Sequence, residues 1–190
     1  MKGDAVYRPL EAGMLTPQAP FDGILLYWCP PGTMHERAAE FAKRAADEYD
    51  VTVDVHEFPE GTKTAADAAE AIDCDVAQIA SSIAMDADDL VVVVTSGANR
   101  VDESRLADLR DVAPDAVGMA DPEEIRATLG WAIGGVPPFC HDADVPVYVD
   151  ETLTDFETVW AAAGTPEAVF PIAPDRVVAL ADATVVDVAE

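Results

Sequence analysis

The chain has 190 residues, and half of them are hydrophobic, which is enough to form one buried core. Acidic residues outnumber basic ones by 37 to 11, and the resulting net charge of -26 argues against a DNA partner. No apolar run approaches the roughly 18 residues of a membrane helix, so we expect no membrane partner. We interpret the acidic surface as a halophilic adaptation, because dense carboxylates keep a protein hydrated in concentrated salt.

The first 33 residues differ in composition from the rest of the chain. They contain five prolines, few charged residues and no regular hydrophobic periodicity, whereas the strongly acidic composition begins at Met34. We therefore expect residues 1–33 to be a poorly ordered N-terminal extension or a mis-assigned translation start, and 34–190 to be a single domain. No secretory signal is evident, and three scattered cysteines do not suggest a disulfide framework, so a cytoplasmic location is expected.

Helices and strands alternate after this boundary. An amphipathic pattern predicts a helix at about 35–49, and alternating apolar and polar residues predict a strand at 51–58. Thr64 and Asp67 have the spacing of a partial capping box, which predicts a helix over 64–72. Two strands, at 78–85 and 90–95, are expected to be joined by an acidic turn at 86–89.

The second half of the chain continues this alternation. We expect a helix at 103–111, a strand at 117–119, a helix at 122–129, strands at 146–150 and 168–173, a helix at 174–181 and a strand at 184–188. Asp121 and Pro122 are typical of the beginning of a helix. Because the order has no strict β-α-β rhythm, it predicts an α+β fold with a mixed sheet flanked by helices.

The segment 130–139, with sequence Gly-Trp-Ala-Ile-Gly-Gly-Val-Pro-Pro-Phe, is the most distinctive part of the chain. Gly134 and Gly135 allow a close approach of the backbone to a ligand and leave N–H groups to donate hydrogen bonds. Pro137 and Pro138 stiffen the segment. The pattern is typical either of a tight structural turn or of a rigid edge against which a polar substrate lies.

Other polar residues have a structural interpretation beside a functional one. His56 lies in an expected strand, and Lys63 is one of three lysines, in a loop. Ser81 and Ser82 interrupt an apolar strand, so their hydroxyls point to opposite faces and one of them faces inward. A buried hydroxyl either bonds to the backbone or lines a pocket. No metal-ligand spacing, phosphate loop or dinucleotide fingerprint is present, so no metal and no cofactor are expected.

Four groups of residues occur in an order that is found in one known family. They are His56-Glu-Phe-Pro; Thr64-Ala-Ala-Asp-Ala-Ala with Gln78-Ile; Ala120-Asp-Pro with Gly134-Gly-Val-Pro-Pro; and Val149-Asp-Glu-Thr-Leu with Ala163-Gly. Together these residues make 34–190 resemble the YbaK/prolyl-tRNA synthetase-associated domain family, the trans-editing aminoacyl-tRNA deacylases.

The resemblance implies a barrel-like mixed sheet surrounded by helices, with a pocket for the aminoacyl-adenosine end of tRNA. Family members hydrolyse the ester of mischarged tRNA, such as cysteinyl or alanyl tRNA for proline, by means of a water assisted by the substrate's ribose hydroxyl. The family's glycine-xxx-proline loop matches Gly134 to Pro138, which suggests that backbone N–H groups at Gly134 and Gly135 stabilise the oxyanion. The residues expected to bind substrate are His56, Lys63, Ser82, Val136, Pro137 and Pro138.

One position departs from the family pattern. Ser81 replaces the family lysine that follows the Gln-hydrophobic pair, and a serine has neither its charge nor its reach. Either Lys63 supplies the charge, or the enzyme acts on a substrate that needs no lysine, or the fold binds an aminoacyl-adenosine-like ligand without catalysis. A small-molecule hydrolase with the same pocket is a further alternative. The sequence therefore predicts a deacylase that edits tRNA for proline or a similar tRNA, with a binding module as the main alternative.

The partner expected from the resemblance is the tRNA acceptor end that carries a mischarged amino acid. Binding of RNA by so acidic a chain requires a local basic patch. Four arginines are expected to form it: Arg100, Arg105, Arg110 and Arg126. Trp131 and Trp160 could stack on a base, although a tryptophan with apolar neighbours more commonly belongs to a core.

Overall fold

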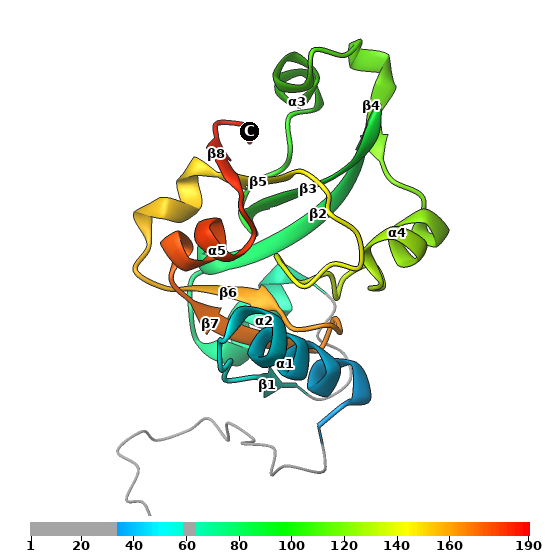
Figure 1. The fold of residues 1–190 in the computed structure, drawn as a ribbon. Coiled ribbons are helices and arrows are strands. Elements are labelled where there is room, and N and C mark those ends of the chain that lie inside the picture. Colours follow the sequence, from blue (N-terminus) through cyan, green and yellow to red (C-terminus); the bar gives the residue numbers. More distant parts are fainter. Residues whose placement is uncertain (1–33, 59–63) are drawn as a thin grey trace, which may run out of the picture.

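The structure, a computed structural model, describes residues 34–58 and 64–190. Within these residues, eight strands form one mixed sheet in the order β1-β7-β6-β2-β3-β5-β8, and β4 pairs with β2 beside this path (Figure 1). The strands are β1 His56–Glu57, β2 Ile79–Ala87, β3 Asp89–Ser96, β4 Val117–Met119, β5 Val147–Asp150, β6 Val159–Ala162, β7 Ala168–Ile172 and β8 Thr184–Val186. The helices are α1 Glu36–Tyr49, α2 Ala65–Ile72, α3 Glu103–Arg110, α4 Pro122–Leu129 and α5 Pro174–Leu180.

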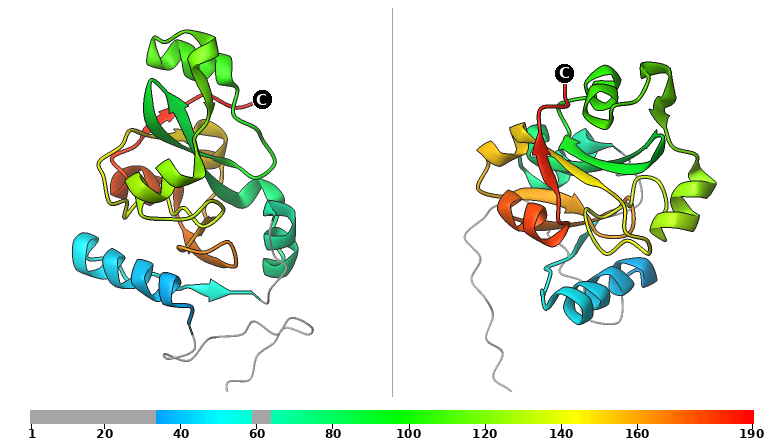
Figure 2. Two further views of the ribbon diagram at one scale, coloured as in Figure 1. Left: turned by 90° about the vertical axis from the view of Figure 1, so that its right-hand side faces the viewer. Right: turned by 45° about the horizontal axis from the view of Figure 1, so that its top comes forward.

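The expected α+β architecture with a mixed sheet is confirmed. The sheet is not a closed barrel, because β1 and β8 end the path and do not pair with each other in the described parts of the chain. The described residues also contain three short 3₁₀ helices: η1 Val76–Gln78, η2 Pro114–Ala116 and η3 Glu151–Asp155. Figure 2 shows α3 at one end of the molecule and α1 at the opposite end.

The main core lies between α1 and the sheet. Phe41 of α1 is fully buried, and its ring centroid lies 5.0 Å from that of Phe170 in β7 and 5.5 Å from that of Phe139. A second cluster, which includes Val91 and Val93 of β3, lies on the other face of the sheet. Because side chains alternate along a strand and both faces are covered here, β3 has an uninterrupted apolar sequence.

The hairpin of β2 and β3 is confirmed, with longer strands and a tighter turn than the sequence predicts. Ala87 pairs with Asp89, so only Asp88 lies between the strands. Its φ of 74° is in the left-handed region, which aspartate tolerates better than most residues. Asp86 and Asp89 therefore extend the strands, and Asp88 alone lies in the turn.

Two strand predictions need correction. The predicted strand at 51–58 is wrong over 51–55, since only His56 and Glu57 pair with β7. The alternation that suggested a longer strand reflects Val53 and Val55, which pack against the main core without a neighbouring strand in the described residues. Strand β6 was not predicted, because four residues are too few to show a reliable period.

One edge of β2 is open near its middle. On this edge β6 pairs with Ile79 and Ala80, and β4 pairs with β2 from Met85 onward. Residues 81–84 lie between these partners, and within the described residues they pair only with β3 on the other edge. The gap therefore leaves the backbone N–H and C=O groups on this edge of 81–84 without a partner strand among the described residues.

Two predictions concern residues outside the described ranges. These are the extension at 1–33 and the role of Lys63. In the described parts of the chain, no helix is long and apolar enough to span a membrane.

Candidate functional site

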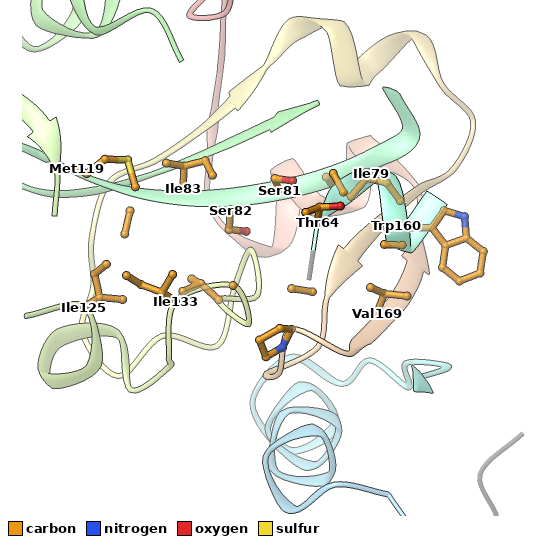
Figure 3. A pocket seen from close by; sticks show the side chains of 18 residues that line it. Thr64, Ile79, Ser81, Ser82, Ile83, Met119, Ile125, Ile133, Trp160 and Val169 are labelled. Carbon is orange, nitrogen blue, oxygen red and sulfur yellow. The ribbon is translucent and has the colours of Figure 1, made fainter. Parts of the chain in front are cut away.

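A cavity of about 230 Å³ opens at the gap in β2 (Figure 3). Its walls come from β2, α2, α4, β6, β7 and the segment that contains Gly134. Apolar side chains such as Ile79, Ile125, Ile133 and Val169 make up most of the lining. Hydroxyls are supplied by Thr64, Ser81 and Ser82, and no charged side chain lines the cavity among the described residues.

The side-chain hydroxyl of Ser82 lies at this cavity. Figure 3 shows its side chain on the side of β2 that faces Ile125 and Ile133, with Ser81 on the other side. The Ser82 Oγ is buried and has no hydrogen-bond partner among the described residues. Buried hydroxyls are nearly always paired, so a ligand or a water is needed to complete this one.

The main chain of Ser82 also faces the open edge. The Ile79 carbonyl accepts from Gly97 N–H at 2.7 Å, so Ile79 directs its backbone groups toward β3. Alternate residues of an antiparallel strand direct these groups to opposite edges, which turns those of Ser82 toward the gap. The Ala84 carbonyl confirms this direction, because it accepts from Ala120 N–H at 3.2 Å on that side.

The loop opposite Ser82 is built from glycines that a larger residue cannot replace. Gly134 has a φ of 83°, and Gly135 N–H donates to the Ala132 carbonyl at 3.0 Å, which closes a turn. A Cβ on Gly135 would lie 2.7 Å from the Cα of Thr165. Within the described residues, the N–H groups of Gly134 and Val136 have no such partner, and both residues line the cavity.

Side chains behind this loop hold it in place. Trp131 is fully buried and donates from Nε1 to the Cys140 carbonyl at 2.8 Å, while the Arg37 guanidinium lies 4.4 Å from its ring centroid. His141 Nε2 donates to the Pro137 carbonyl at 2.8 Å. Burial lowers the pKa of His141 despite this hydrogen bond, so the imidazole is neutral at pH 7.

Comparisons with known proteins identify the family. A sequence model described as the aminoacyl-tRNA editing domain matches residues 59–180. The chain belongs to the aminoacyl-tRNA editing domain family. The resemblance noted in the sequence is thereby confirmed.

Relatives and solved structures agree with this assignment. The uncharacterised protein YwhH of Bacillus subtilis (strain 168) is 31% identical over 64% of this chain and 76% of its own. A crystal structure described as a candidate trans-editing enzyme for prolyl-tRNA synthetase is 35% identical, with a TM-score of 0.76 over 83% of this chain and 99% of that one. The hypothetical protein APE2540 shares the fold, with 23% identity and a TM-score of 0.70 over 79% of this chain and 99% of its own.

The structure brings some of the predicted site residues of this editing domain together. Ser81, Ser82, Gly134 and Val136 line the cavity. Gly135 does not, because it lies against the backbone of 164–165 and its N–H is used within the turn.

The remaining predicted site residues that the structure describes lie away from the lining. The Pro137 carbonyl is occupied by His141, and Pro138 faces a different cavity. His56 contacts Asp54 at 3.2 Å and lies edge-on to Trp160, with ring centroids 5.2 Å apart. Trp160 lines the cavity, whereas His56 does not. His56 therefore packs against a lining residue from outside the cavity.

Sequence reasoning missed most of the apolar lining. Ile125 and Val169 carry no motif, and Thr64 was recognised only as a helix cap. Trp131 belongs to the core, whereas Trp160 is half-buried at the cavity. The described residues contain no group of three or more His, Cys, Asp or Glu side chains that could hold a metal ion.

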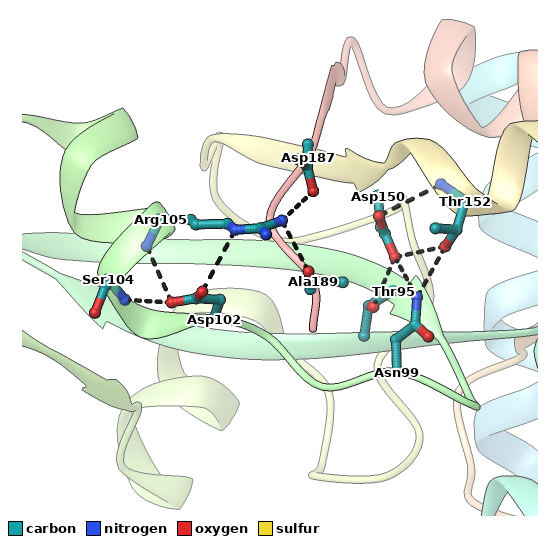
Figure 4. Close-up of polar contacts among 9 residues, drawn as sticks. All are labelled: Thr95, Asn99, Asp102, Ser104, Arg105, Asp150, Thr152, Asp187 and Ala189. Carbon is teal, nitrogen blue, oxygen red and sulfur yellow. Dashed lines mark hydrogen bonds and ion pairs between the residues drawn. The ribbon is translucent and has the colours of Figure 1, made fainter.

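Two of the four arginines in the predicted basic patch form ion pairs with carboxylates. Arg105 contacts Asp187 and Asp102 (Figure 4), and Arg110 lies 3.7 Å from Asp89. Arg100 and Arg126 are exposed and form no ion pair with the described residues. Two of these four arginines, rather than all four, are therefore free of ion pairs with the described residues.

Proposed function

We propose that this editing domain is a deacylase that hydrolyses the ester of mischarged aminoacyl-tRNA in trans. The Ser82 hydroxyl, which has no partner among the described residues and lies in an apolar cavity that Gly134 also lines, carries the proposal. A site of this kind fits a small polar group attached to a small apolar side chain. The 35% identity to a protein described as a candidate trans-editing enzyme for prolyl-tRNA synthetase supports tRNA for proline, or a similar tRNA, as the substrate.

The proposed chemistry uses the backbone of the loop and the edge of β2. A water attacks the ester carbonyl carbon, helped by the ribose hydroxyl of the substrate, and a tetrahedral oxyanion forms. The N–H groups of Gly134 and Val136 are available to stabilise that charge. The carbon–oxygen bond to the ribose then breaks, the ribose oxygen takes a proton, and the free amino acid leaves. Ser82 holds the aminoacyl group through its hydroxyl and main chain.

The lining also limits the amino acid that the site accepts. Ile79, Ile125, Ile133 and Val169 surround about 230 Å³ without a charged side chain among the described residues. A charged amino acid would lose its hydration in this cavity without gaining a partner. We therefore propose a small, uncharged amino acid as the group removed.

A non-catalytic binding module remains the second candidate function. Ser81 occupies the position of the family lysine, and the described lining supplies no replacement charge. Such a module would hold an aminoacyl-adenosine-like ligand in the same cavity without cleaving its ester.

A deacylation panel in molar KCl separates these two functions. Alanyl-, cysteinyl- and seryl-tRNA are incubated with wild type, Ser82→Ala and Gly134→Ala. Loss of one hydrogen bond to the substrate should lower kcat/KM about tenfold in Ser82→Ala. Displacement of the loop N–H groups should lower it about 100-fold in Gly134→Ala. Ser104→Ala is the matched control, because Ser104 is exposed on α3 and lies outside the cavity.

Each outcome of the panel decides between the two functions. Turnover that is unchanged in Gly134→Ala would remove the loop from the mechanism. No turnover by wild type on any tRNA, with activity that appears in Ser81→Lys, would establish the binding module instead.

A further inference from the structure

The segment 130–141, which contains the N–H groups assigned to the oxyanion, is closed at its base. Asp142 N–H donates to the Leu129 carbonyl at 3.2 Å. Further into the segment, Trp131 Nε1 donates to the Cys140 carbonyl at 2.8 Å. The segment is therefore a compact loop with fixed ends, and the position of its tip depends on contacts made inside the loop.

The tip of this loop is tied by a side chain of the loop itself. Pro137 and Pro138 have no N–H, so hydrogen bonds can hold this stretch only through its carbonyls. The Pro137 carbonyl accepts from His141 Nε2 at 2.8 Å. Pro137 is buried and directly follows Val136, so the bond fixes the chain next to one of the two N–H groups assigned to the oxyanion.

The backbone adopts an unfavourable conformation just before His141. Cys140 has a φ of 66°, in the left-handed region that residues with a Cβ rarely adopt. The turn at Cys140 lets the imidazole reach back to a carbonyl four residues earlier. Burial raises the pKa of the Cys140 thiol to about 12, so this residue is no nucleophile at pH 7. Backbone strain of this kind persists where the surrounding structure enforces it, and it is concentrated at functional sites.

Helix α1 holds the backbone of His141 from outside the loop. Arg44 donates from Nη2 to the His141 carbonyl at 3.1 Å and from Nη1 to the Asp142 carboxylate at 2.7 Å. Burial lowers the pKa of the imidazole and the Arg44 cation lowers it further, against the opposite effects of the Pro137 carbonyl and Asp142. The neutral ring carries its one proton on Nε2, because a carbonyl oxygen only accepts.

We propose that His141 is a positioning residue for the hydrolysis, which sets the direction of the Gly134 and Val136 N–H groups through its hydrogen bond to the Pro137 carbonyl. His141 does not line the cavity, so it acts on the substrate only through the loop. This inference rests on the proposed function, because it concerns the N–H groups that stabilise the oxyanion in that function.

His141→Gln and His141→Asn, assayed in molar KCl, separate this hydrogen bond from the rest of the side chain. Both replacements are uncharged amides, but only the longer one carries an N–H group to the position of the imidazole Nε2. On the tRNA that wild type hydrolyses fastest, His141→Asn should lower kcat about tenfold to 100-fold with little change in KM, because a displaced loop weakens contacts made in the transition state. His141→Gln should keep kcat within about threefold of wild type.

NMR of the same proteins without substrate gives a readout that does not depend on turnover. The backbone order parameters of the Gly134 and Val136 amides should be about 0.85 in wild type and His141→Gln, and should fall toward about 0.6 in His141→Asn. The ring nitrogens of His141 in wild type should show the proton on Nε2 at pH 7.

Four results would overturn the proposal. They are equal losses of kcat in the two variants, an unchanged kcat in His141→Asn even with a lower Tm, unchanged order parameters in His141→Asn, and a wild-type ring that carries its proton on Nδ1. The last result is measured on wild type, so the test does not depend on whether a variant folds.

The two measurements also separate this proposal from the deacylase. Lower order parameters at Gly134 and Val136 in His141→Asn, without turnover by wild type on any tRNA, would remove the hydrolysis and keep His141 as the residue that fixes the loop. Equal turnover by wild type and His141→Asn would keep the hydrolysis and remove the positioning role.

Discussion

Gly135 shows how a missing side chain shapes the site. It does not touch the cavity, yet its contact with the backbone of 164–165 brings the loop next to β7. Pro166, which lines the cavity, follows directly in the chain. The glycine pair therefore has two separate roles, with Gly134 at the ligand and Gly135 at the packing contact.

A substitution at Gly135 should lower stability for this reason. In Gly135→Ala the new Cβ would lie 2.7 Å from the Cα of Thr165, and backbone atoms cannot move away as a flexible side chain can. We expect a decrease of about 1–3 kcal/mol in the free energy of unfolding, measured by urea denaturation. Gly118→Ala is the control, since a Cβ there meets no atom within 4 Å and should cost little. Equal stabilities of the two variants would show that the contact at Gly135 is unimportant.

Ser81 and Ser82 could not be told apart from their positions in the sequence. The sequence predicts that one hydroxyl faces inward, and the alternation of a strand makes this a safe expectation. Sequence spacing alone cannot determine which one it is. The choice of Ser82 depends on two short partner strands, β6 and β4, that leave 81–84 without a strand partner on one edge of β2 in the described residues. This arrangement involves residues from distant parts of the chain.

At the scale of elements, local signals predicted most boundaries well. The capping box at the beginning of α2 is present, with Asp67 N–H donating to Thr64 Oγ1 and Thr64 N–H donating to Asp67 Oδ2, both at 3.1 Å. Helix α4 begins at Pro122 after an Asp121 cap, as predicted. These signals act within four residues, so no tertiary information is needed to recognise them.

Removal of the α2 cap should affect both stability and the cavity wall. Thr64 caps the helix and also lines the cavity, so Thr64→Ala should lower the free energy of unfolding by about 1 kcal/mol. Thermal denaturation followed by circular dichroism measures the change. Thr158→Ala provides the comparison, because Thr158 is exposed and its hydroxyl makes no hydrogen bond with the described residues. A loss as large in Thr158→Ala would argue against a capping effect.

At the scale of the whole molecule, the net charge of -26 is the dominant property. Self-repulsion of this size destabilises a compact state unless salt screens it. Most of the described cations are already used in ion pairs with nearby carboxylates, such as Arg44 with Asp142 at 2.7 Å. Carboxylates outnumber the basic residues by 37 to 11, so most of them depend on the solvent for screening.

Stability should therefore rise with salt concentration. The Debye length falls from about 10 Å at about 0.1 M to about 3 Å at about 1 M, so KCl over this range should raise the Tm in calorimetry at pH 7. The same titration close to the sequence pI of about 4.1 is the control, because the net charge there is small and the response should shrink. A Tm that stays constant or falls with KCl at pH 7 would contradict the halophilic interpretation.

The helices, the hairpin, the glycine-proline loop and the family could be predicted from the residues alone, because capping, periodicity and motif order act over short stretches of chain. What this loop faces depends on contacts between distant parts of the chain. The opening in β2 exists because β6 and β4, which come from distant parts of the chain, each cover one end of the strand and leave its middle free. That arrangement selects Ser82 over Ser81 and separates Gly134 from Gly135, and such long-range packing has no signature in any short run of residues.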